Sequence, residues 1–279
     1  MRIDVMKTYK LFINGSFPRS ESGRVYEITD SKGKFLANPC LGSRKDLRES
    51  VVAARAAHAG WSGATAFNRG QILYRVAEIM QGRADQFIAE LIAQEGATPA
   101  AAKTQVQSAI DTWVWYAGWC DKIDSISGSS NQVSGPFYNF SIPESLGVVA
   151  IFADAKPSLL NLVASLAPVI ATGNTAILIA NEKSPLCAIT LAECLATSDV
   201  PAGVVNILTG KFDQFVSWAG SHMDIDGIDA TGVSNKDLIE LKELGSENLK
   251  RIHTFNELQS TKRMTNFMEI KTIWHPIGI

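Results

Sequence analysis

The sequence has few cysteines, and none of them forms a paired motif. Its four cysteines are far apart or isolated, with no CxxC spacing: Cys40, Cys120, Cys187 and Cys194. A disulfide framework and a zinc site built on closely spaced thiolates are therefore not expected. The four histidines are scattered singly as well, so we expect no metal site.

An excess of one sign of charge is also missing. The chain carries 26 Lys and Arg against 28 Asp and Glu, which gives a net charge of −2. Without an overall basic field, the chain has nothing to hold a phosphate backbone or an anionic membrane. We therefore expect neither nucleic acid nor a membrane as a partner.

Long hydrophobic runs are lacking too. The first residues have no uninterrupted apolar core of the kind found in signal peptides, and Gly, Asn, Asp or Lys interrupt the later apolar runs. These interruptions come well before the roughly 18 residues that a membrane-spanning helix needs. The expected localisation is cytoplasmic.

What is present is an ordinary globular composition. The chain has 279 residues, 46% of them hydrophobic, with 21 glycines and ten prolines. This length suggests one large domain or two modest ones.

Near the start, Asn14-Gly15 lies between apolar residues and predicts a tight hairpin turn, because both residue types tolerate positive φ.

Helical patterns follow from Ser43 onward. Ser43 and Asp46 form a capping box, and apolar residues recur at helical spacing until Gly60, which is expected to stop the helix. Asn68 is expected to cap the next helix.

A long helix is predicted from about residue 101 to 123, and it is rich in large rings: Trp113, Trp115, Tyr116 and Trp119. The rings could form a ligand box, but we interpret them as core or subunit interface.

The second half alternates short apolar runs with helical patterns. A polar stretch and the alternating residues after it, about 127–146, predict a projecting β-ribbon. The apolar runs then read as parallel strands joined by helices, two of which have proline in the expected first turn. The predicted fold class is α/β with a doubly wound parallel sheet, and its strands are GVVAIF (147–152), TAILIA (175–180), VVNIL (204–208) and IDGID (225–229).

Several segments in this order resemble the amino-terminal and coenzyme-binding half of aldehyde dehydrogenases. They are LFING, VVAARAAHAGWS, YAGWCDKI, ESLGVVAIF, APVIATGNTAILIANEKSPL and VPAGVVNILTG. The resemblance covers about Leu11 to Gly232 and implies a Rossmann-like domain over 1–257, with N-terminal helices and the β-ribbon. The remaining residues, 258–279, would form a C-terminal oligomerisation tail, and the catalytic domain would be absent.

The resemblance also implies a chemistry against which the chain can be checked. Aldehyde dehydrogenases oxidise an aldehyde bound to a cysteine, pass hydride to NAD(P) and hydrolyse the thioester with a glutamate-activated water. The asparagine that donates to the oxyanion corresponds to Ala155 here. Lys156 follows it and is expected to turn toward water or Asp154, because a cation is unfavourable at a helix start.

The cofactor positions are partly kept. Ile179 replaces the lysine that holds the ribose, while Glu182 remains, either as a ribose acceptor or, as we favour, as a charge at a helix start. In the phosphate-binding turn, Asp237 replaces the last glycine, and Ser234 with Asp237 also forms a capping box. The resemblance thus leaves a set of degenerate cofactor-binding remnants: Glu182, Gly210, Thr231, Gly232 and Ser234.

The catalytic groups have no clear counterpart. Phe255 stands where the family has its water-activating glutamate, with Glu257 displaced by two residues, and no cysteine lies in the nucleophile's context. The segment MEIKTIW (268–274) resembles the last strand of complete aldehyde dehydrogenases. An internal loss between Glu257 and Met268 explains this pattern, which is similar to the second, incomplete unit of the class sixteen enzymes.

Two functions are compatible with these residues. In the favoured one, the chain is a pseudoenzyme that needs no cofactor and serves assembly. It forms a homo-oligomer, or a hetero-oligomer with a full-length aldehyde dehydrogenase. In the alternative, it is an oxidoreductase module that binds NAD or NADP and takes catalytic groups from another chain.

Overall fold

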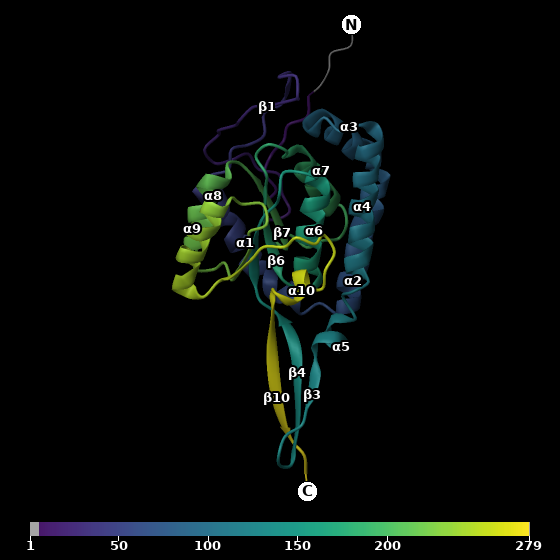
Figure 1. Cartoon of the computed structure of the whole chain (residues 1–279), viewed down its shortest axis with the longest axis vertical. Coiled ribbons are helices and arrows are strands. Elements are labelled where there is room, and N and C mark those ends of the chain that lie inside the picture. The colour runs from purple at the N-terminus through teal and green to yellow at the C-terminus, as the bar shows by residue number, and fades with distance from the viewer. Residues whose placement is uncertain (1–5, 279) are drawn as a thin grey trace.

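A five-stranded parallel sheet forms the centre of the molecule (Figure 1). The structure is a computed structural model and describes residues 6–278. The strand order is β7-β6-β5-β8-β9, so the chain leaves β5 first to one side and then to the other. The predicted doubly wound sheet is therefore confirmed, with β5 (Val148–Phe152), β6 (Thr175–Ala180), β7 (Val205–Thr209), β8 (Gly227–Asp229) and β9 (Arg251–His253).

Helices cover both faces of this sheet, which is why its strands are continuously apolar. Successive residues of β6 point to opposite cores: Ile177 and Ile179 to one, Leu178 and Ala180 to the other. The first core includes α1 (Arg44–Ser62), α8 (Phe212–Ser221) and α9 (Asn235–Gly245). The second includes α6 (Ser158–Ala171) and α7 (Leu186–Leu195), with an outer layer of α2 (Ala66–Gly82), α3 (Ala84–Glu95) and α4 (Pro99–Ala117).

The helix boundaries correct some of the sequence predictions. The capping box of Ser43 and Asp46 is confirmed, but α1 continues past Gly60 to Ser62. Thr65, not Asn68, caps α2, because the Thr65 hydroxyl accepts a hydrogen bond from the Asn68 backbone N–H. The two prolines, Pro157 and Pro185, precede the first turns of α6 and α7 as N-cap residues.

The aromatic helix is shorter than predicted. Helix α4 begins after the cap Thr98 and ends at Ala117, and a turn separates it from α5 (Ile123–Ser127). Trp113 and Tyr116 are fully buried, which confirms the core interpretation for these two rings. Trp115 and Trp119 are partly buried and pack against the same core.

The predicted ribbon projects from the body as a three-stranded arm (Figure 1). We define the arm as β3 (Ser129–Asn131), β4 (Phe137–Ser145) and β10 (Met268–Pro276), in the order β10-β4-β3. Strand β10 pairs with β4 along its whole length, from Met268 opposite Ser145 to Pro276 opposite Phe137. Two segments far apart in the sequence thus build one arm.

Residues 254–267, here called the linker, connect the sheet to the arm. The linker contains α10 (Lys262–Thr265), which packs against α6, and its Met264 and Phe267 are fully buried. Residues 258–267 therefore lie on the body, and the arm begins at Met268.

Smaller elements complete the chain. Asn14 and Gly15 both have positive φ in the turn joining Ile13 to Ser16, which confirms the predicted hairpin turn. The remaining elements are β1 (Ile28–Thr29), β2 (Phe35–Ala37) and the short helix η1 (Ser246–Asn248). Within residues 6–278, no helix is both long and apolar enough to cross a membrane.

Candidate functional site

The candidate site lies at the carboxyl ends of β5 and β8, where the order of the strands reverses. Ligands bind outside such a switch point in open α/β sheets. A cavity of about 300 Å³ is present there. The turns after β5 and β8 line it together with the linker, through Asp154, Lys156, Thr231, Phe255, Asn256 and Arg263.

A buried ion pair lies beneath this cavity. Arg263 of the linker donates to Asp229, the last residue of β8, with Nη1 and Oδ2 3.2 Å apart. Both side chains are at most 3% exposed. Burial raises the pKa of Asp229, while the charge of Arg263 opposes that rise.

Further contacts fix Arg263 in place. Its Nη1 also donates to Ser165 Oγ of α6 at 3.2 Å, and its Nε donates to the carbonyl of Glu257 at 2.6 Å. The guanidinium group lies 4.7 Å from the centre of the Phe255 ring. The linker is thereby fastened across the ends of the strands. Sequence reasoning missed this pair, although a charged residue at the carboxyl end of a predicted strand was a signal for Asp229.

The turn after β8 holds two of the predicted remnants. Thr231 donates through its backbone N–H and its hydroxyl to Asp229 Oδ1, and its Oγ1 accepts from the backbone N–H of Phe255. A Cβ on Gly232 would lie 2.6 Å from the backbone of Ala153. The glycine is therefore required because this turn packs directly on the end of β5.

Ser234 caps α9, the helix that follows this turn. Its Oγ accepts from the backbone N–H of Asp237 at 3.2 Å and donates to the Asp237 carboxylate at 2.8 Å. The expected capping box is only half formed, since the carboxylate contacts the serine hydroxyl instead of its backbone N–H. Asp237 places a negative charge at the helix start, where the family has a glycine.

Glu182 and Gly210 lie near the ends of β6 and β7. The Glu182 carboxylate accepts from the backbone N–H of Phe212, the first residue of α8, at 3.1 Å. It is thus a charge at a helix start, as favoured from the sequence, but the helix is α8 and not the one that follows Glu182. Gly210 has a φ of 151°, and a Cβ there would lie 2.9 Å from the ring of Phe215.

Lys156 is exposed, as one of the two predicted alternatives required, but its hydrogen-bond partner is not Asp154. Its Nζ donates to the backbone carbonyl of Glu95 at 3.0 Å, at the carboxyl end of α3. The Asp154 carboxylate instead accepts from the backbone N–H of Ala155. A lysine is favourable at the end of a helix, where the carbonyl dipoles accumulate negative charge.

The thiols are unsuited to nucleophilic attack. All four cysteines are buried. Burial raises the pKa of Cys120 to about 12 and that of Cys194 to about 11, and it raises the pKa of Cys187 as well. The reactive form of a cysteine is the thiolate, which burial disfavours at Cys120, Cys187 and Cys194. Residues 6–278 also contain no cluster of three or more His, Cys, Asp or Glu side chains that could hold a metal ion.

These contacts decide how well a dinucleotide fits. In the family, the ribose needs a lysine and a free glutamate, and the pyrophosphate needs open backbone amides at a helix start. Here Ile179 is buried and apolar, the Glu182 carboxylate is bonded to α8, and Asp237 adds a negative charge to the first turn of α9. The residues present therefore do not fit NAD or NADP in the way that the resemblance implies.

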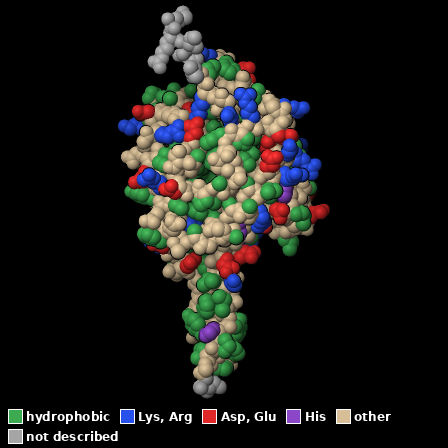
Figure 2. All heavy atoms as spheres, turned by 180° about the vertical axis from the view of Figure 1, so that it is seen from behind, with side chains coloured by type: hydrophobic (Ala, Val, Ile, Leu, Met, Phe, Trp, Pro, Cys, Tyr) green, Lys and Arg blue, Asp and Glu red, His purple; other side chains and the backbone are tan. Residues whose placement is uncertain are grey.

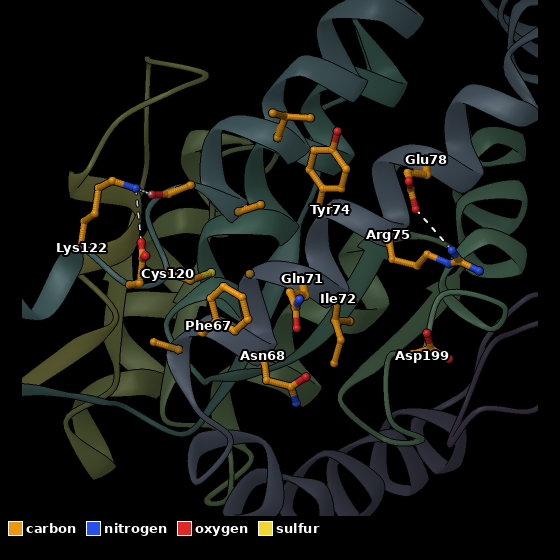
Figure 3. Close-up of a pocket in the computed structure, with 16 residues that line it drawn as sticks. Phe67, Asn68, Gln71, Ile72, Tyr74, Arg75, Glu78, Cys120, Lys122 and Asp199 are labelled. Carbon is orange, nitrogen blue, oxygen red and sulfur yellow. Dashed lines mark hydrogen bonds and ion pairs between the residues drawn. The ribbon is translucent and has the colours of Figure 1, made fainter.

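A second hollow lies on the outer helical layer, away from the sheet ends. Figure 3 shows this groove of about 800 Å³ between α2 and the end of α4. Phe67 and Tyr74 are exposed in it, and Arg75 pairs with Glu78 at 3.4 Å. The thiol of Cys120 lines it but is held protonated by burial. The groove contains no paired nucleophile and base.

Comparison with known proteins gives a consistent result. The aldehyde dehydrogenase family profile matches residues 17–255. Mouse mitochondrial 10-formyltetrahydrofolate dehydrogenase is 30% identical over 88% of this chain and 27% of its own length. Human retinal dehydrogenase 2 is 30% identical over 88% of this chain and 48% of its own length. The chain thus spans about half the length of the second relative and about a quarter of the first.

Solved structures agree on the fold. An aldehyde dehydrogenase from Bacillus cereus in complex with NAD⁺ superposes with a TM-score of 0.83 at 24% identity. An NADP-dependent enzyme from E. coli gives 0.84 at 23% identity. Each alignment covers 88% of this chain and 50% of the other. With a family match that spans most of the sequence, the chain belongs to the aldehyde dehydrogenase family.

Proposed function

We propose that this chain is a non-catalytic aldehyde dehydrogenase-like subunit that functions in assembly. It pairs through its arm with a second copy or with a complete aldehyde dehydrogenase. The observation that carries the proposal is the arm itself, which extends from the body and presents apolar side chains that no other described part of the chain covers.

Each face of the arm carries aromatic or aliphatic side chains among polar ones. Phe137 and Trp274 contact each other on one face, with ring centres 5.8 Å apart, and Tyr138 and Phe140 stack at 5.3 Å. Trp274 and Ile270 are each 57% exposed. Figure 2 shows that hydrophobic side chains dominate the visible face of the arm, whereas charged side chains are spread over the body. Exposed apolar surface of this kind is typical of an interaction site.

The arm also offers backbone groups for pairing. Strand β10 is the outermost strand of its sheet, so one edge of it has no partner strand among residues 6–278. An uncovered edge strand is a template for pairing with another chain. The uncovered edge of β10 favours association by addition of a β-strand, and the exposed aromatic and aliphatic side chains of the arm favour association by packing.

The arrangement of the linker supports the non-catalytic part of the proposal. The resemblance places the catalytic domain between the coenzyme-binding domain and the last strand. In this structure β9 and β10 are joined by residues 254–267 alone, and Arg263 holds that linker against Asp229. The linker thus lies over the strand ends at which the chemistry would take place.

A second candidate function is a module that binds NAD or NADP and contributes to aldehyde oxidation with groups from another chain. The retained turn of Thr231, Gly232 and Ser234 at the switch point favours it. Calorimetry with the two dinucleotides separates the two candidates, as argued below.

Sedimentation tests the assembly proposal. We expect the wild-type chain to sediment as an oligomer, alone or when mixed with a complete aldehyde dehydrogenase from the same host. Ile270→Ser with Trp274→Ser should abolish this association, because both changes remove exposed apolar contacts from the arm. Phe67→Ser, an equally exposed change on α2, serves as the control and should sediment like wild type. The proposal would be contradicted if the wild-type chain were a monomer that does not bind the complete enzyme. It would also be contradicted if the double variant sedimented with the same mass as the wild-type oligomer.

A further inference from the structure

A large basic cleft lies on the body, at a place that the assembly function does not use. Its volume is about 1050 Å³, and it is lined by the loop before β1, the first turns of α1 and the last turn of α8. It shares no lining residue with the cavity at the strand ends. The residues that matter are Arg24, Arg44, Lys45, Arg48, Trp218 and His222.

The positive charges of this basic cleft are largely uncompensated. Glu21 is the acidic residue in the lining, and it pairs with Lys45 at 3.4 Å. The side chains of Arg24, Arg44 and Arg48 are exposed and have no carboxylate within ion-pair distance in the described part of the chain. Three arginines therefore line one hollow without an ion-pair partner among the described residues.

Helix stability does not explain this placement. Cations near the start of a helix oppose its dipole, and α1 begins with Arg44 and Lys45, followed by Arg48 one turn later. Asp46, the acidic residue of the first turn, is only 2% exposed and is used in the capping box and in a hydrogen bond to Ser20. An anion in the cleft would meet favourable potential from both the guanidinium groups and the helix.

The aromatic wall adds a second kind of contact. Trp218 lines the cleft and is half-buried, held edge-on by Phe215 at 5.5 Å. Burial lowers the pKa of His222; the carboxylate of Asp224 opposes this shift, and the nearby charges of Lys250, Arg44 and Arg48 add to it. An indole wall next to guanidinium groups suits a planar heterocycle that carries phosphate.

We propose that the basic cleft binds a small organic phosphate with a planar ring, of the kind that nucleotides represent. The phosphates contact Arg24, Arg44 and Arg48, and the ring lies against Trp218. Arginine suits this role because its planar fork of donors matches phosphate oxygens. The site is separate from the switch point at which the family resemblance places its coenzyme.

Calorimetry with three probes tests the ligand class. Adenosine triphosphate should bind saturably, inorganic pyrophosphate at least about tenfold more weakly, and adenosine without measurable affinity. Raising the salt concentration should weaken binding of both phosphates, because exposed charges are screened. Lack of saturable binding by both phosphates would overturn the proposal.

Variants locate the binding. Arg44→Ser with Arg48→Ser should lower the affinity for adenosine triphosphate at least about tenfold. Trp218→Leu should reduce the difference in affinity between adenosine triphosphate and pyrophosphate. Arg75→Ser on α2, an exposed arginine outside the cleft, is the matched control and should bind like wild type. Circular dichroism spectra matching wild type confirm that the variants are folded. Unchanged affinity in the double variant would show that the phosphates bind elsewhere and overturn the assignment.

Discussion

At the residue scale, the structure depends on a few charged side chains in places where charge is costly. Asp229 and Arg263 are both almost completely buried, and each needs the other to remain charged there. Removing one member of such a pair leaves an uncompensated buried charge, which costs more than the pair itself contributes. The pair therefore determines whether the linker stays on the strand ends.

Arg263→Met should lower the free energy of unfolding by about 3–5 kcal/mol, because it leaves Asp229 buried without a partner. Urea unfolding followed by circular dichroism measures the loss. Arg75→Met is the control, since its exposed pair with Glu78 is worth at most about 1 kcal/mol. The double change Asp229→Leu with Arg263→Met should restore part of the stability, because it removes the unpaired charge but leaves the Thr231 donors without their acceptor. A single variant within about 1 kcal/mol of wild type would show that the pair does not fasten the linker.

Some of these residues could be read from the sequence and others could not. Ala155 and Ile179 stand at positions where the resemblance requires polar donors, so their loss was visible without a structure. Arg263 lies in a linker whose contacts have no counterpart in the resemblance, and its burial depends on long-range packing against α6. The basic cleft was equally hidden, because Arg24, Arg44 and Trp218 come together only in space.

At the scale of the elements, helix starts were predicted best where side chain and spacing agreed. Ser43 and Asp46 satisfy each other's backbone groups, and α1 begins where the capping box predicts. For α2 the predicted cap, Asn68, was wrong, because Thr65 lies directly before the first turn and Asn68 lies within it. The end of α4 was misplaced because apolar spacing continues past Gly118, where the backbone turns.

Ser43→Ala should lower the free energy of unfolding by about 1 kcal/mol, the usual cost of removing an N-cap hydroxyl. The loss follows because the backbone N–H of Asp46 loses its acceptor. Thermal and urea unfolding measure the effect. Ser62→Ala near the other end of α1, where the hydroxyl makes only a 3.4 Å contact, should change stability by less than about 0.5 kcal/mol. Equal losses in the two variants would show that the capping box does not stabilise α1.

At the scale of the whole molecule, the sequence predicted the doubly wound sheet and the projecting ribbon because both follow local rules. Apolar runs alternate with helical patterns in the first case, and rings alternate with polar residues in the second. The path of the linker and the pairing of β10 with β4 depend on contacts between distant segments. Local patterns do not encode such contacts, so residues 258–267 were expected to belong to the C-terminal oligomerisation tail.

At the scale of the whole molecule, the altered switch point predicts that the chain does not bind a dinucleotide there. We expect no saturable heat of binding with NAD or NADP at the strand ends and no aldehyde-dependent formation of reduced cofactor, because Glu182, Ser234 and Asp237 are bonded within the chain. Calorimetry and absorbance measure the two outcomes. Since the basic cleft could take up a nucleotide on its own, the titration is repeated in Arg44→Ser with Arg48→Ser. Micromolar binding that survives in this variant would support the module that borrows catalytic groups.

The arm has a consequence for how the protein is made. The hydrogen bond between Ser141 and Thr272 joins positions 131 residues apart, so β4 leaves the ribosome long before its partner strand is synthesised. Until then, the rings of β4 lack the neighbouring strand β10, and nascent chains with exposed apolar surface are prone to aggregate. Between the synthesis of β4 and that of β10, a chaperone or another chain can therefore bind β4 in place of β10.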